Sequence, residues 1–227
     1  MSDSAPNPQL LRSLGKLARG LSALFWGLPA ALLICAETAR AEWLKPLGFL
    51  PALAINGLLL YGLWQMGDFQ KQERPWRAAL DRAQLLALIL LGLSPFIYWH
   101  NKLPDEPFFK WAVALLELAA VLFLFNLNLV LKRLGAMLPD ETLRGETRQF
   151  TALNRWLLVV LLLFAIAFIC LMQFPHPSPG VGRALVWLNR ASGLLLIFLI
   201  LLPLAMTMAL IWKTKEVILD AVFGARG

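Results

Sequence analysis

The sequence predicts an all-α protein that crosses a lipid bilayer about six times, with both termini in the cytoplasm. Three observations lead to this fold class: a composition too apolar for a soluble domain, six long apolar stretches, and an uneven distribution of Lys and Arg between them. Of the 227 residues, 59% are hydrophobic and only 15% are charged, whereas soluble domains carry about 25% charged residues. A bilayer accommodates the excess, because lipid-facing positions are apolar as well.

The six apolar stretches are Leu-rich and lack the period-two alternation of barrel strands. About 20 helical residues, at 1.5 Å each, cross the roughly 30 Å hydrocarbon core. The second, fourth and sixth stretches reach that length, the third and fifth are slightly short, and the first, with 16 residues, is the weakest. The stretches are Leu21–Ala36, Pro46–Met66, Gln84–His100, Trp111–Leu131, Trp156–Gln173 and Ala191–Trp212.

Lys and Arg residues concentrate in alternate gaps between these stretches. The N-terminal segment, the gaps after the second and fourth stretches and the C-terminal tail hold 15 of the 21, while the other gaps hold 5. Cytoplasmic loops are enriched in Lys and Arg, so this division places both termini in the cytoplasm. If Leu21–Ala36 did not cross, the division would fall to 12 against 8. Six crossings are therefore preferred, and five is the alternative if this stretch, with Gly27 and Pro29, is interfacial.

We expect three segments along the chain. Residues 1–20 form a cytoplasmic segment with a basic amphipathic helix on the inner leaflet. Residues 21–212 form the transmembrane bundle, and residues 213–227 form a short cytoplasmic tail. The amphipathic helix has one leucine face and a basic remainder: Leu10, Leu14, Leu17 and Leu21 against Arg12, Lys16 and Arg19. Ala39-Arg40-Ala41 resembles a signal-peptide cleavage site, but Glu37 and Arg40 place charges where cleavage needs none.

Prolines mark helix starts and breaks. Pro75 suits the first turn of a helix. Pro139, followed by two acidic residues, predicts a further helix that runs into the fifth crossing. Pro95 and Pro203 are expected to kink the third and sixth helices. Two small-residue pairs predict close helix packing: Ala23 with Gly27, and Ala205 with Ala209.

Glu117 is the strongest candidate for a functional residue within the crossings. It lies six residues after Trp111, or about 9 Å into the fourth crossing. A charge at mid-bilayer costs roughly 2.5–3.5 kcal/mol, so intramembrane carboxylates are functional candidates. The commoner interpretation is a protonated or hydrogen-bonded Glu that joins two helices. Arg190 is expected at similar depth and is the candidate partner, although its side chain is also long enough to reach the outer headgroups.

Two amides, Asn56 and Asn126, complete the candidate polar site. Asn128 and Asn189 also lie in the crossings. Hydrogen bonds between membrane helices contribute about 0.6 kcal/mol on average, so a structural role is the default for such amides. Asn126 and Asn128 point about 200° apart on a helix and are not expected to line one pore.

No sequence motif specifies a reaction. The chain contains no phosphate-binding glycine loop, nucleophile elbow or HExxH motif. Its two Cys lie inside apolar stretches and its two His near predicted outer boundaries, which argues against a metal or haem site. We therefore predict a protein that is not an enzyme and carries no cofactor. An intramembrane lipid enzyme using Glu117 and His100 is the weakest alternative.

The favoured function is that of an accessory or scaffold subunit in the cell membrane, which in a bacterium is the inner membrane. The net charge of +7 arises from basic residues beside apolar stretches, so anionic headgroups are expected partners and nucleic acid is not. Other membrane proteins, or further copies of the chain, are the remaining expected partners. The main alternative is a small-solute transporter or channel using Glu117 and Arg190.

Overall fold

The computed structural model describes residues 8–40, 45–70, 72–137, 141–172 and 200–220, in which all regular structure is helical. Within these described residues, three helical segments are long and apolar enough to cross a membrane: Arg12–Ala39, Arg74–Lys102 and Pro107–Met137. The predicted all-α class is thus confirmed. The helices are α1 (Pro8–Arg40), η1 (Lys45–Leu47), α2 (Leu50–Met66), α3 (Arg74–Leu93), α4 (Pro95–Lys102), α5 (Pro107–Met137) and α6 (Glu141–Met172), followed by a C-terminal helix of residues 200–220.

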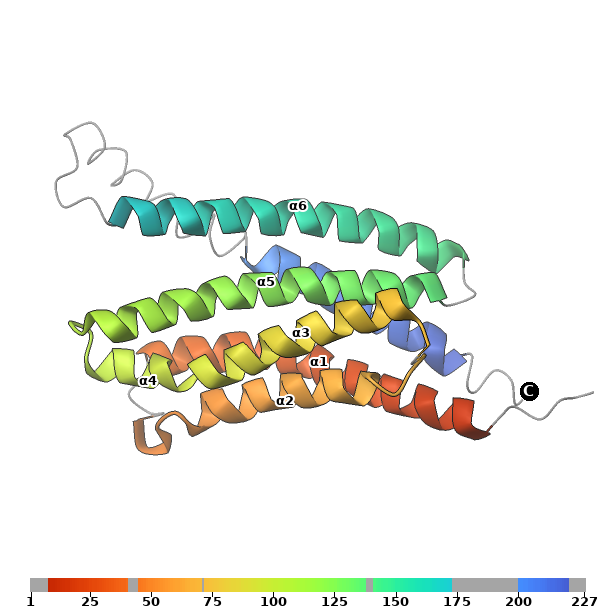
Figure 1. Ribbon diagram of the computed structural model, residues 1–227, viewed down its shortest axis with the longest axis horizontal. Coiled ribbons are helices and arrows are strands. Elements are labelled where there is room, and N and C mark those ends of the chain that lie inside the picture. The colour runs from red at the N-terminus through yellow and green to blue at the C-terminus, as the bar shows by residue number, and fades with distance from the viewer. Residues whose placement is uncertain (1–7, 41–44, 71, 138–140, 173–199, 221–227) are drawn as a thin grey trace, which may run out of the picture.

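The long helices lie side by side along one axis, and the chain reverses direction between them (Figure 1). Helix α1 packs against α2, while α3 and α6 pack against α5. Helix α6 lies at the edge of the bundle, and the C-terminal helix, drawn in blue, lies behind α5. One apolar core joins α1, α2, α3, α5 and the C-terminal helix. Its members from the C-terminal helix are Leu204, Leu210, Ile211 and Ile218.

Helix α1 is continuous across the boundary expected at residue 20. Its 33 residues combine the basic amphipathic segment with the first apolar stretch. Leu17, Leu21, Leu24 and Leu28 are buried along one face, at most 5% exposed. Because this leucine face keeps the helical period through residue 20, it packs into the bundle on both sides of that residue. The division of the chain at residue 20, with a cytoplasmic segment before it, stays a prediction.

Glycines let α1 and α2 approach closely. A Cβ on Gly20 would lie 2.5 Å from the Gly62 carbonyl oxygen, and one on Gly27 would lie 2.8 Å from a methyl group of Leu59. A Cβ on Gly62 would in turn lie 3.3 Å from the Cβ of Ala23. The predicted packing of Ala23 and Gly27 is therefore confirmed. In contrast, Ala205 and Ala209 are exposed, so this pair makes no close helix contact within the described residues.

Prolines lie at the start of several helices, including the two starts discussed from the sequence. Pro75 lies in the first turn of α3, and the following Trp76 is buried and donates from Nε1 to the Phe69 carbonyl at 3.0 Å, which closes the α2–α3 turn. Pro95 starts α4 after a break at Ser94, as predicted. The carbonyl that Pro203 would leave without its helical hydrogen bond belongs to residue 199, which lies outside the described residues, so the kink at Pro203 stays a prediction. Helix α6 runs unbroken from the predicted extra helix into the fifth apolar stretch.

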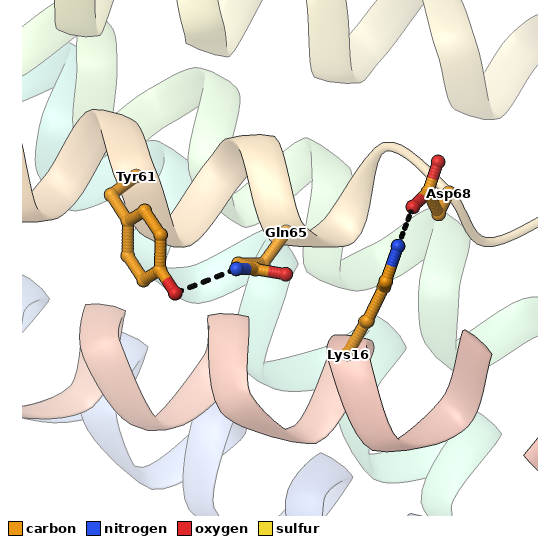
Figure 2. A network of polar contacts seen from close by, with 4 residues as sticks. All are labelled: Lys16, Tyr61, Gln65 and Asp68. Atoms are coloured by element: carbon orange, nitrogen blue, oxygen red, sulfur yellow. Dashed lines mark hydrogen bonds and ion pairs between the residues drawn. The ribbon is translucent and has the colours of Figure 1, made fainter. Parts of the chain in front are cut away.

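Polar contacts hold the two ends of the bundle. At one end, Lys16 of α1 forms an ion pair with Asp68 in the α2–α3 turn, and Gln65 donates from Nε2 to Tyr61 Oη at 2.6 Å (Figure 2). At the other end, Asn101 Nδ2 at the end of α4 donates to the Thr38 carbonyl of α1 at 3.3 Å. The α2–α3 turn and the end of α4 therefore lie at opposite ends of α1.

Candidate functional site

A buried cluster of polar side chains joins three helices. Asn128 lies on α5, Asn154 on α6 and Thr207 on the C-terminal helix, and none is more than 1% exposed. The cluster forms because these helices are otherwise apolar, and a buried polar group is unfavourable unless it is hydrogen-bonded. We name this set the Asn–Asn–Thr cluster.

The hydroxyl of Thr207 is the centre of the cluster. It donates to the Pro203 carbonyl at 2.7 Å and accepts from Asn128 Nδ2 at 2.9 Å and Asn154 Nδ2 at 3.0 Å. Asn154 Nδ2 also lies 2.9 Å from Asn128 Oδ1 and 3.2 Å from the Pro203 carbonyl oxygen. Asn128 Nδ2 donates in addition to the Leu124 carbonyl of its own helix at 2.8 Å. Each amide nitrogen thus contacts acceptors alone, which fixes the orientation of both amides.

The chemistry available to the cluster is hydrogen bonding between neutral groups. Amides and hydroxyls of this kind do not titrate near neutral pH, so the cluster has no general acid or base. Among the described residues, no group of three or more His, Cys, Asp or Glu side chains is placed to hold a metal ion. The arrangement is suited to fixing three helices relative to one another.

Glu117, the strongest candidate from the sequence, lies on an exposed face of α5. Arg190 lies outside the described residues, so the Glu117–Arg190 contact stays a prediction. One helical turn after Glu117, at Val121, begins an apolar cavity of about 160 Å³ between α5 and α6. The cavity is lined by Val121, Leu122, Phe125, Leu158, Val159 and Leu162.

The predicted amides do not form one site with Glu117. Asn56 Nδ2 donates to the Ala52 carbonyl of α2 at 2.8 Å and contacts Cys35 Sγ of α1 at 3.8 Å, so this amide lies at the α1–α2 contact. Asn126 is half-buried and donates from Nδ2 to the Leu122 carbonyl at 2.9 Å. It lies nine residues after Glu117, which places the two on opposite sides of α5.

Asn154 and Thr207 were not among the candidates predicted from the sequence. Asn154 directly precedes Arg155 and Trp156 and so lies just outside the fifth apolar stretch. Thr207 lies inside the sixth stretch but carries a hydroxyl, whereas the predicted candidates are amides and charged groups. The sequence did contain an indication of the Asn128–Asn154 contact, because these residues lie near the facing ends of two consecutive predicted helices.

Comparisons with protein-family models, with curated proteins and with solved structures gave no match.

Proposed function

We propose that the chain is a multi-pass protein of the cell membrane that crosses the bilayer six times, has both termini in the cytoplasm, and acts as a non-enzymatic accessory or scaffold subunit. The observation that carries this proposal is that the amide donors of the described helices are occupied by hydrogen bonds within the bundle. Asn128 and Asn154 bond between helices, and Asn56 and Asn126 bond to a carbonyl of their own helix. None of these amides contributes a reactive group.

The outer surface of the bundle supports a lipid environment. Large apolar side chains are exposed on every long helix, and soluble monomers rarely expose contiguous apolar surface on this scale. In a bilayer these side chains contact acyl chains. Examples are Trp26 (68% exposed), Trp64 (75%), Leu85 (58%), Leu115 (54%) and Leu163 (61%).

The two ends of the bundle support the proposed orientation. The Lys16–Asp68 pair joins two segments that the charge distribution assigns to the cytoplasm. Opposite them lies an aromatic cluster at the α4–α5 turn, which suits headgroup depth. In this cluster Phe96 packs edge-on against Phe108, with ring centroids 5.6 Å apart, and Lys102 Nζ lies 4.7 Å from the Tyr98 ring centroid.

A partner surface on α6 favours the scaffold role. With 32 residues, α6 is about 48 Å long and extends well beyond the roughly 30 Å hydrocarbon core. On its N-terminal part, Phe150 (43%) and Leu153 (56%) are exposed on one side of the helix, whereas the exposed Arg148 and Arg155 lie on the opposite side. An exposed apolar pair beyond the acyl chains fits a partner whose contact surface has an apolar centre.

The proposal is tested by purifying the tagged chain from native membranes in mild detergent. We expect a stoichiometric protein partner, which is lost in the double variant Phe150→Ala/Leu153→Ala. A matched pair of exposed residues on α3, Leu85→Ala/Leu88→Ala, should retain it. The proposal fails if the chain purifies alone and catalyses solute uptake in proteoliposomes that Glu117→Gln abolishes. That result would establish the transporter alternative.

A further inference from the structure

Most buried polar side chains of the bundle bond to their own helix. The hydroxyls of Thr38, Thr207 and Thr214 donate to the carbonyl four residues earlier, as does that of Ser22. The amides of Asn56, Asn126 and Asn128 do the same. This bond is the default for a short polar side chain in a helix with apolar surroundings, because it satisfies a donor locally.

Thr151 and Asn154 of α6 are exceptions to this pattern. Thr151 is 5% exposed and Asn154 is fully buried. Thr151 Oγ1 and Asn154 Oδ1 have no hydrogen-bond partner in the described part of the chain. The two residues are three apart, so their Cβ atoms lie about 5–6 Å apart on one face of the helix.

The Asn–Asn–Thr cluster has no spare donor for these oxygens. Asn154 Nδ2 already lies within 3.2 Å of three acceptors, and Asn128 Nδ2 donates to two. Rotating the Asn154 amide would place its oxygen against Asn128 Oδ1 and the Pro203 carbonyl, which are both acceptors. The donor that satisfies Asn154 Oδ1 must therefore come from outside the cluster.

We propose that Thr151 and Asn154 bind a buried water molecule that bridges Thr151 Oγ1 and Asn154 Oδ1. A water has two donors and two acceptors, and its reach of about 2.8 Å to each oxygen suits side chains one turn apart. A buried acceptor without a partner has lost its hydration without replacement, which is the usual reason for an ordered internal water. A cation is less suited, because the cluster is neutral and presents amide protons.

The direct test is a density map, at about 2 Å or better, of the full chain in lipid or detergent. The expected result is one peak about 2.8 Å from both oxygens in the wild type and in Thr151→Ser, and none in Thr151→Val. The proposal is overturned if the map shows other ordered waters but none here. It is also overturned if, in a sample that contains thallium(I), this ion occupies the position of the peak, because the bound species would then be a monovalent cation.

Thermal unfolding gives a second readout that does not depend on resolution. Thr151→Val should lower the midpoint by about 2–4 °C, because it removes the water and leaves Asn154 Oδ1 without a donor. In an Asn154→Leu background the same change should have little effect, since the second oxygen is already gone. Equal shifts in both backgrounds would show that the two residues act independently and would contradict a shared water.

Discussion

The contact between α1 and α2 allows a sharp test of the fold, through replacement of Gly20 with alanine. A Cβ at this position would lie 2.5 Å from the Gly62 carbonyl oxygen and 2.8 Å from Met66 Cγ. Ordinary contact begins near 3.4 Å, so the two helices must separate by roughly 0.9 Å. Because the carbonyl oxygen belongs to the backbone of α2, the change cannot be absorbed by one side-chain rotation.

Gly15 provides the matched control in the same helix, because a Cβ there would meet nothing within 4 Å. Alanine is more favourable than glycine in a helix by roughly 0.5–1 kcal/mol, and both variants gain this term. The difference between them therefore isolates the overpacking at Gly20. Forcing extra atoms into a packed contact costs about 1–3 kcal/mol, and each kcal/mol lowers the unfolding midpoint by about 2–4 °C in a protein of this size.

The assay is thermal unfolding of the two purified variants and the wild type in one detergent. We expect Gly15→Ala to unfold at or above the wild-type temperature and Gly20→Ala to unfold below it. If the two variants unfold at the same temperature, α1 and α2 do not approach each other through Gly20, and the packing described for them is wrong.

Three further predictions follow from other contacts. Thr207→Val should lower the unfolding free energy by about 1–3 kcal/mol, because two buried amides lose an acceptor. The control Thr214→Val loses one hydrogen bond to its own helix and should lower the unfolding free energy by less. Equal losses in the two variants would contradict a central role for Thr207. Trp76→Phe should cost more than about 1 kcal/mol and make the α2–α3 turn more sensitive to protease, since it removes the hydrogen bond to Phe69 and part of a buried ring system. Unchanged proteolysis would contradict this role. Glu117→Gln should cost under about 1 kcal/mol in stability measurements, whereas a loss several times larger, recovered by Arg190→Gln, would instead establish a buried ion pair.

Much of the helical framework could be predicted from the sequence, because it depends on local chemistry. The lengths of the apolar stretches predicted the long helices that the structure describes. Pro95 predicted the break between α3 and α4. Pro139 and its acidic neighbours predicted that a helix begins before the fifth apolar stretch, as α6 does. The extent of a helix was harder to predict where no proline or capping residue marks its end. The leucine face of α1 continues through residue 20 within one helix, and no residue there indicates whether the helix stops or continues.

The polar site was less predictable, because it depends on which helices become neighbours. Glu117 was a candidate site residue because it is a charged residue in an apolar stretch, yet it lies on an exposed face of α5. Thr207 looked like an ordinary helix residue, yet its hydroxyl accepts from two amides on other helices. These contacts depend on how α5, α6 and the C-terminal helix align along their axes. The sequence pattern predicts which side of each helix is apolar, but it does not predict which helices pack together.

The proposed topology of six crossings, with both termini on one side, can be tested by labelling single cysteines in sealed vesicles. In a chain with Cys35→Ala and Cys170→Ala, one cysteine is placed at Ser2, Lys102 or Gly227 and exposed to a membrane-impermeant thiol reagent from one side. We expect positions 2 and 227 to be labelled from the same side and position 102 from the opposite side. Labelling of positions 2 and 227 from opposite sides would contradict this topology and leave an odd number of crossings.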